Sequence, residues 1–159
     1  MLVIGKDTLQ QIIAQAERAY PAECCGILVG RREDVRVVTC ARPAANVSRD
    51  GRRDRYEIDS AEIYRVSRET EGTAEQIVGF YHSHPDFPPH PSVHDAAKAW
   101  PYYSYLIVSI RNGSNPARNG MSNGGKISLR SWVWQNGKGE FREEPVEVKL
   151  VSGPVDVLS

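Results

Sequence analysis

The segment that most constrains how this chain can fold is IVGFYHSH (77–84), which is apolar at first and then abruptly polar. A short apolar run of this kind predicts a strand buried in a sheet. Prolines follow at positions 85, 88, 89 and 91, and proline has no backbone N–H to contribute to regular structure. The chain is therefore expected to contain a central strand that ends in polar side chains and leads into an irregular loop as far as Ser92.

The rest of the chain predicts short helices and strands of one mixed domain. Apolar residues at helical spacing indicate a first helix capped by Asp7 or Thr8, and Asp59 or Ser60 is expected to cap a second. The predicted helices are 8–20, 60–71 and 92–100; the predicted strands are 26–30, 35–40, 56–58, 77–84, 102–110, 127–134 and 139–144, the last two joined at Asn136-Gly137. With 159 residues and no internal repeat, the chain predicts a single α/β or α+β domain.

Charge and cysteine content argue against several classes of protein. Twenty Lys and Arg balance twenty Asp and Glu, so we expect no nucleic-acid partner and no membrane association. The longest apolar runs are too short for a membrane-spanning helix. The first ten residues lack the pattern of a secretory signal, and three cysteines do not make a disulfide framework. A reducing, cytoplasmic location is the expectation.

The residues whose side chains could bind a metal or take part in a reaction lie between positions 82 and 95. Residues two apart on a strand face the same way, so His82 and His84 are expected to present two imidazoles side by side. The loop returns through a helix whose first turn holds Asp95. Two imidazoles and one carboxylate, without nearby thiolates, are typical of a catalytic zinc site with one open position. Ser92 lies three residues before Asp95, a spacing that also fits an ordinary capping box.

Two further histidines are rival ligands. His90 lies in the proline-rich loop, where its direction is poorly controlled, and His94 is the neighbour of Asp95 on the helix. Adjacent helical residues point about 100° apart, so His94 is expected to face solvent or to support a ligand from behind. We favour Asp95 as the third ligand.

A hydrolytic metal site also needs a general base. Glu23, in PAECCG just before the apolar run GILVG (26–30), is the candidate, because an acid beside a buried strand is unusual without a task. The alternative is an exposed residue that only connects a helix to a strand. Cys24 and Cys25 suggest a thiol mechanism, but no histidine is placed by sequence to activate them, and buried packing is the favoured interpretation.

The segments PAECCGILVG (21–30) and GFYHSHPDFPPHPSVHDAAKAW (79–100) together resemble the JAMM/MPN+ zinc metalloprotease family. The signature of that family is an upstream Glu followed by H-x-H-P-x6-S-x2-D, and every position is met. The order of the remaining segments is similar to the compact prokaryotic branch. The resemblance implies an MPN domain over 1–145, with a curved mixed sheet flanked by helices and a cytidine-deaminase-like fold, and a C-terminal strand or tail over 146–159. The H-x-E and P-C-x-x-C motifs of base deaminases are absent.

Applied to this sequence, the resemblance implies that His82, His84 and Asp95 ligate one Zn²⁺ per chain. Glu23 would orient and deprotonate a water in the fourth position, and would then protonate the departing amine. Ser92 would donate a hydrogen bond to the oxyanion of the tetrahedral intermediate. The implied enzyme is a zinc metalloprotease, a deubiquitinase-like isopeptidase.

The resemblance also implies a substrate. Family members cut after the Gly-Gly tail of ubiquitin-like or sulfur-carrier β-grasp proteins, and an extended tail can add to a sheet edge. Residues 43–55, with the loop 86–91, are the expected rim for the tail, and residues 31–55 carry eight Arg against four acids. Two alternatives stay open: a non-catalytic MPN binding module, and a sulfur-transfer accessory that binds a carrier protein. The Asn- and Gly-rich loop 112–125 is interpreted as slack, and no oligomeric state follows from these residues.

Overall fold

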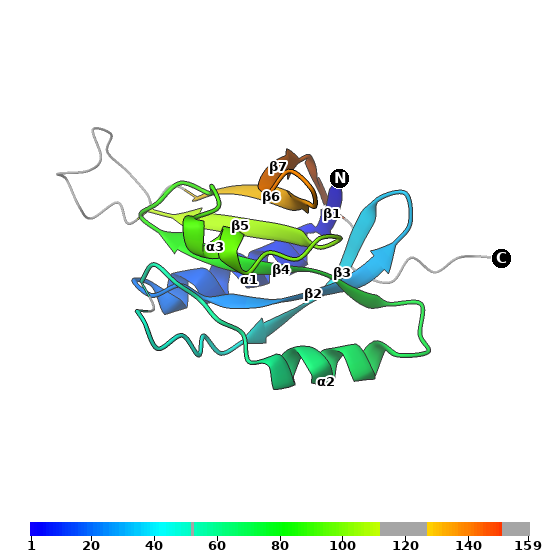
Figure 1. Ribbon diagram of the computed structural model, residues 1–159. Coiled ribbons are helices and arrows are strands. Elements are labelled where there is room, and N and C mark those ends of the chain that lie inside the picture. Colours follow the sequence, from blue (N-terminus) through cyan, green and yellow to red (C-terminus); the bar gives the residue numbers. More distant parts are fainter. Residues whose placement is uncertain (52, 112–126, 151–159) are drawn as a thin grey trace.

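The structure is a computed structural model that describes residues 1–51, 53–111 and 127–150. The predictions for the loop at 112–125 and for the tail from residue 151 lie outside this part of the chain. Figure 1 shows the helices and strands in colours that follow the sequence. In chain order the described elements are β1 (Leu2–Gly5), α1 (Lys6–Ala19), β2 (Cys25–Arg32), β3 (Arg36–Ala44), α2 (Ser60–Thr70), β4 (Gln76–Pro85), α3 (Val93–Ala97), β5 (Ser104–Ile110), β6 (Ile127–Gln135), β7 (Glu140–Glu144) and β8 (Val146–Lys149).

These strands form one mixed sheet in the order β7-β6-β5-β4-β2-β3-β1-β8. β1 is parallel to β3 and β8, and β4 is parallel to β5, whereas the other neighbours are antiparallel. The edge strands β7 and β8 are separated in the chain only by Pro145, whose carbonyl accepts the Leu2 N–H at 2.9 Å. Because consecutive strands occupy opposite ends of the order, the sheet must curl almost to closure. This confirms the predicted α+β domain with a curved mixed sheet.

Glu144, the last residue of β7, connects several strands of the curled sheet. Its side chain is buried and accepts hydrogen bonds from the hydroxyls of Ser104 on β5 and Ser131 on β6. It also pairs with Arg36 of β3 at 3.4 Å and with the Met1 ammonium at 3.1 Å. Partners of this kind are what compensates a buried carboxylate for its lost hydration.

Alternation along β2 divides the core into two layers. Leu28 belongs to the cluster that contains Ile12 of α1, whereas Ile27 belongs to the cluster that contains Val66 of α2. α1 therefore packs on one face of the sheet and α2 on the other (Figure 1). The longest helix, α1, has 14 residues, and within the described ranges no helix has the length and apolar character needed to cross a membrane.

β4 lies between β2 and β5 and carries the predicted histidines. His82 is opposite Cys25 of β2 on one side, and His84 is opposite Ser109 of β5 on the other. Backbone pairing on both sides fixes the direction of the side chains at this end of the strand. The chain then leaves through the proline-rich loop to Ser92, which is the N-cap of α3.

Several local predictions are wrong. α1 begins at Lys6 with Gly5 as its N-cap and no side-chain cap, so Asp7 lies inside the first turn. Residues 56–58 are not a strand, and α3 ends at Ala97 rather than at residue 100. β1 was not predicted, because a four-residue strand is too short for a periodic pattern to identify, and β8 lies within the C-terminal strand or tail expected over 146–159. Asp59 does cap α2 as predicted, accepting the Ala61 N–H at 2.9 Å.

Candidate functional site

Two imidazoles converge at the end of β4. His82 and His84 are both buried, and their Nε2 atoms lie 3.1 Å apart. Nδ1 of His84 lies 2.8 Å from the Pro88 carbonyl, which can only accept, so Nδ1 carries a proton and Nε2 is the ring nitrogen that a metal could bind. The proline-rich loop therefore has a definite task at this position, which is to fix the tautomer of one histidine.

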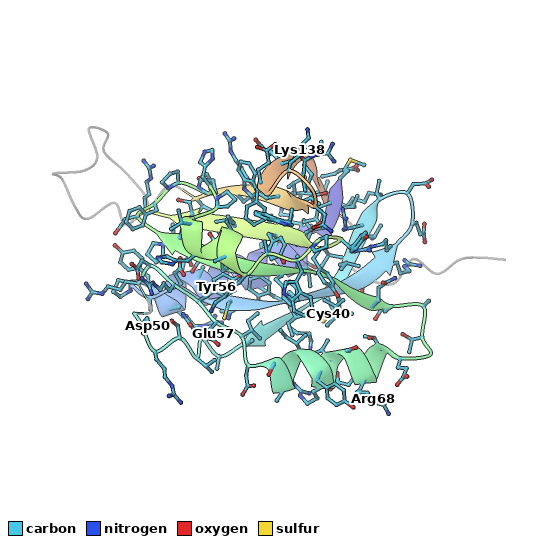
Figure 2. The ribbon with its side chains drawn as sticks, in the orientation of Figure 1. Cys40, Asp50, Tyr56, Glu57, Arg68 and Lys138 are labelled. Atoms are coloured by element: carbon cyan, nitrogen blue, oxygen red, sulfur yellow. The ribbon has the colours of Figure 1, made fainter. Side chains whose placement is uncertain are left out.

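The ring of His82 is held differently. It stacks on Tyr56, with centroids 4.3 Å apart and an interplanar angle of 20°. Tyr56 is labelled in Figure 2 and belongs to the connection between β3 and α2, as does Asp50. Nδ1 of His82 is buried and has no hydrogen-bond partner among the described residues. Burial is the main cause that lowers the pKa of His82, and it favours the neutral imidazole that metals bind.

Asp95 reaches the same point from α3. Its Oδ1 lies 3.3 Å from His82 Nε2, and its Oδ2 lies 3.6 Å from His84 Nε2. The capping box is also present, because Ser92 N–H donates to Asp95 Oδ2 at 2.6 Å and Asp95 N–H donates to Ser92 Oγ at 3.1 Å. Burial opposes ionisation of Asp95, but the two histidines and the Ser92 N–H outweigh it and hold its pKa well below the usual range. Asp95 therefore both takes part in the capping box of α3 and places its carboxylate next to the two histidines.

Glu23, just before β2, completes the cluster from another direction. It is 5% exposed, and its Oε1 lies 3.7 Å from His84 Nε2, so the alternative of an exposed connector is wrong. Burial, followed by the charges of Asp95 and Asp54, raises the pKa of Glu23 to about 9. Within one cluster, the pKa of Glu23 is therefore raised while that of Asp95 is lowered. Adjacent carboxyl groups with opposite pKa shifts are typical of acid–base sites.

The donor set fits a metal ion. Ligand atoms of Glu23, His82 and His84 all lie within 4.8 Å of one another. Two ligands about 2.0–2.1 Å from a tetrahedral zinc are about 3.3–3.4 Å apart. The 3.1 Å between the two Nε2 atoms and the 3.3 Å from His82 Nε2 to Asp95 Oδ1 are close to that edge length, whereas the 3.6 Å from His84 Nε2 is measured to the other oxygen, Oδ2. Asp95 is not in that group, but its two carboxylate oxygens lie 3.3 and 3.6 Å from the imidazoles of His82 and His84, compared with 3.7 Å between Glu23 and His84.

The rival residues lie elsewhere. His90 and His94 are exposed, and the His90 ring lies 5.4 Å from that of Trp132. Cys24 and Cys25 are buried, and burial is the main cause that raises the pKa of both thiols, to about 12 for Cys25. A thiol mechanism through the cysteine pair is thereby disfavoured, in agreement with the packing interpretation.

Sequence analysis missed the residues that hold Glu23 in place. Cys24 N–H donates to Ser83 Oγ at 2.8 Å. The Asn46 amide donates to the carbonyls of Glu23 and Arg55, at 3.2 and 2.9 Å. The sequence does contain a signal for Ser83, because the central residue of the HSH motif must face away from both histidines and toward another part of the chain. Asn46 gives no such signal, because its partners are backbone carbonyls distant in sequence.

An open groove of about 1050 Å³, which we call the α1 groove, begins at Glu23. One wall is the C-terminal half of α1, and the other is the segment after β3. The lining residues are Gln15, Arg18, Ala19, Ala22, Glu23, Cys24, Ala44, Ala45, Asn46, Val47, Ser48, Arg49 and Gly51. Of the four residues of the cluster (Glu23, His82, His84 and Asp95), only Glu23 lines this groove. The described part of the expected rim 43–55 therefore does border a groove next to the cluster.

Comparisons with known proteins agree with this arrangement. A family model described as prokaryotic homologs of the JAB domain matches residues 5–123. The desampylase of Haloferax volcanii is 35% identical over 153 residues, covering 93% of this chain and 96% of the relative. The CysO-cysteine peptidase of Mycobacterium tuberculosis is 34% identical over 149 residues, covering 93% and 91%.

Solved structures show the same fold. The solution structure of a Desulfitobacterium hafniense protein superimposes with a TM-score of 0.75 at 28% identity, covering 95% of this chain and 94% of that one. A JAB1/MPN domain protein from Archaeoglobus fulgidus gives a TM-score of 0.50 at 22% identity, with coverage of 91% and 96%, and supports the fold alone. Together, the matched family model and the two relatives above 30% identity establish that this chain belongs to the prokaryotic JAB branch of the JAMM/MPN family.

Proposed function

We propose that the chain is a zinc-dependent peptidase or isopeptidase that hydrolyses the amide bond after the C-terminal Gly-Gly of a ubiquitin-like or sulfur-carrier β-grasp protein. The observation that carries the proposal is the convergence of His82, His84 and Asp95 beside the buried Glu23. The two relatives, a desampylase and a CysO-cysteine peptidase, support the substrate class. The cytoplasmic location stays a prediction.

In this proposal His82, His84 and Asp95 hold the zinc ion. A bound zinc ion supplies Lewis-acid polarisation of the scissile carbonyl and acidifies water. A cation held by these residues would also favour the ionised form of Glu23, whose pKa is raised by burial. Glu23 then accepts the proton of the attacking water and gives it to the departing nitrogen.

Ser92 has a free proton for the oxyanion. Its Oγ accepts the Asp95 N–H at 3.1 Å, which fixes the direction of the hydroxyl group. No acceptor for the hydroxyl proton is found among the described residues, so this proton is available to a developing negative charge. One serine in this way holds a ligand through its oxygen and stabilises the intermediate through its hydrogen.

The test is cleavage of β-grasp proteins that end in Gly-Gly and carry a C-terminal extension, with the cut site read by mass spectrometry. We expect one cut, after the second glycine, that is abolished by a chelator and restored by zinc. Glu23→Gln, which keeps the shape of the side chain but cannot accept the proton, should not cut. Binding of the carrier without any cleavage by the zinc-loaded wild type would contradict the proposal and favour the binding-module alternative.

A further inference from the structure

The two imidazoles of the cluster are oriented by different means. His84 uses a hydrogen bond from Nδ1 to the Pro88 carbonyl, which is the usual kind of support for a metal-binding histidine. His82 has no such bond within the described residues, although its Nδ1 is buried. Backbone pairing of β4 fixes where the His82 side chain begins, but the torsion that rotates an imidazole about its Cβ–Cγ bond is broad. Another contact must therefore set the plane of this ring.

The Tyr56 ring supplies that contact. It is stacked on His82, with centroids 4.3 Å apart and an interplanar angle of 20°, whereas the His82 and His84 rings are tilted by 59°. The His82 side chain is 1% exposed and Tyr56 is half-buried, so Tyr56 is the outer of the two rings and covers the imidazole. Rotation of the imidazole about its Cβ–Cγ bond would drive an edge of the ring into the face of Tyr56. The stacked ring therefore opposes that rotation.

The position of Tyr56 is fixed in turn by the side chain of Asn46. Nδ2 of Asn46 donates to the Arg55 carbonyl at 2.9 Å, and its Oδ1 accepts the Glu57 N–H at 3.1 Å. Because Nδ2 meets a carbonyl and Oδ1 meets an N–H, the amide cannot be flipped without losing both bonds. The Glu57 carbonyl also accepts the Val47 N–H at 2.9 Å. The backbone is thus tied on both sides of Tyr56.

The same amide reaches the residue that we assign as the base. Nδ2 of Asn46 also donates to the Glu23 carbonyl at 3.2 Å. Asn46 thereby joins the connection that carries Tyr56 to the backbone just before β2. Loss of its side chain should reach the site by two routes, through Tyr56 to a metal ligand and through Glu23 to the base.

We propose that Asn46 and Tyr56 are positioning residues that act in series. Asn46 holds the backbone around Tyr56, and Tyr56 holds the plane of the His82 imidazole. In that plane Nε2 of His82 lies 3.1 Å from His84 Nε2 and 3.3 Å from Asp95 Oδ1. The inference rests on the proposed function, since it concerns how that zinc site is held. Stacking needs the flat ring and not the phenol hydroxyl.

The first test is zinc affinity, measured on the full chain by competition with a chelator. Tyr56→Leu keeps an apolar cover over His82 but removes the flat ring, and it should weaken zinc binding about tenfold to a hundredfold, the range for lost support of a metal ligand. Tyr56→Phe keeps the ring and should bind zinc nearly as tightly as the wild type. At saturating zinc, Tyr56→Leu should recover most of its kcat for carrier cleavage, because the substitution removes no group that reacts.

Phe80→Leu is the matched control. Phe80 lies two residues before His82 on β4, is half-buried like Tyr56, and packs on Tyr103 and Tyr105 instead of on a histidine. The same change from ring to leucine should lower thermal stability without a comparable loss of zinc affinity. An equal loss of zinc affinity in Phe80→Leu would show a general loosening of the fold and would overturn the inference.

The second test is a double-mutant cycle of Asn46→Ala and Tyr56→Leu. Substitutions of residues that act through one another have effects that do not add. We expect Asn46→Ala alone to weaken zinc binding, and the double variant to bind zinc little more weakly than Tyr56→Leu alone. At saturating zinc Asn46→Ala should stay slower than Tyr56→Leu, because it also releases Glu23. Losses of zinc affinity that add fully would overturn the action in series.

The outcomes keep the two proposals apart. Suppose that the wild type binds zinc and cuts the carrier. Wild-type zinc affinity in Tyr56→Leu, or equal losses in Tyr56→Leu and Tyr56→Phe, then overturns the positioning role and leaves the proposed function intact. A wild type that binds no zinc counts against the proposed function itself. The comparison of Tyr56→Leu with Tyr56→Phe decides the inference even if Asn46→Ala does not fold.

Discussion

Cys24 and Ser83 exchange two hydrogen bonds: the Cys24 N–H donates to Ser83 Oγ at 2.8 Å, and the Ser83 N–H donates to the Cys24 carbonyl at 3.0 Å. Cys24 follows Glu23, and Ser83 lies between His82 and His84. The residue that we assign as the base is therefore fastened to the strand that carries two of the ligands. The serine of the HSH motif does this from the face of β4 opposite the histidines.

Removing this hydroxyl should affect the base more than the metal. Ser83→Ala leaves the buried Cys24 N–H without its acceptor, which costs about 1–3 kcal/mol of unfolding free energy. We expect kcat for carrier cleavage to fall at least tenfold, while zinc affinity stays within a few-fold of the wild type. Ser67→Ala, at an exposed position in α2, is the control and should change neither quantity. An equal loss of zinc affinity and kcat in Ser83→Ala would contradict this role.

The cysteines should differ in reactivity because of their burial. Cys24 and Cys25 are buried and have raised thiol pKa values, about 12 for Cys25, whereas Cys40 is exposed. A raised pKa means less thiolate at a given pH, and the thiolate is the reactive form. A disulfide reagent at pH 8 should modify one thiol per native chain and three after unfolding. Cys40→Ser should abolish the native reaction; rapid modification of a second thiol would contradict the structure.

Glu144 should matter for stability and not for chemistry. Glu144→Ala removes the acceptor of Ser104 and Ser131 and the partner of Arg36. Breaking a buried pair by removing one charge costs about 3–5 kcal/mol, and the partly exposed partners favour the lower end of that range. Denaturant unfolding measures the loss. Glu143→Ala is the matched control, since Glu143 pairs with Arg130 on the surface and should cost at most about 1 kcal/mol.

The sequence predicts the parts of the site that depend on local spacing. The H-x-H alternation, the Ser92–Asp95 capping box and the strands on either side follow from the two-residue period of a strand and from helix-capping chemistry, and the structure brings these residues together. Glu23 is predicted as the base from its position just before an apolar strand. The structure adds its burial, which no local pattern contains because α1, β4 and the segment after β3 all contribute to it.

The features that sequence analysis missed depend on contacts between distant segments. Tyr56 was assigned to a strand end, and its stacking on His82 depends on a connection that crosses the sheet. Asn46 binds backbone atoms of residues 23 and 55. The α1 groove requires two walls that are about thirty residues apart in the chain, so it cannot be recognised from the sequence.

The most direct test of the account measures zinc content and carrier cleavage together in the wild type, Asp95→Ala and Glu23→Gln. The wild type and Glu23→Gln should each bind about one zinc per chain, as three protein ligands and one open position require. Asp95→Ala should lose zinc at the same free concentration. Cleavage should fall about 10²–10⁴-fold in Glu23→Gln despite its bound zinc. Loss of zinc from Glu23→Gln, or its retention by Asp95→Ala, would contradict the assignment of Asp95 as ligand and Glu23 as base.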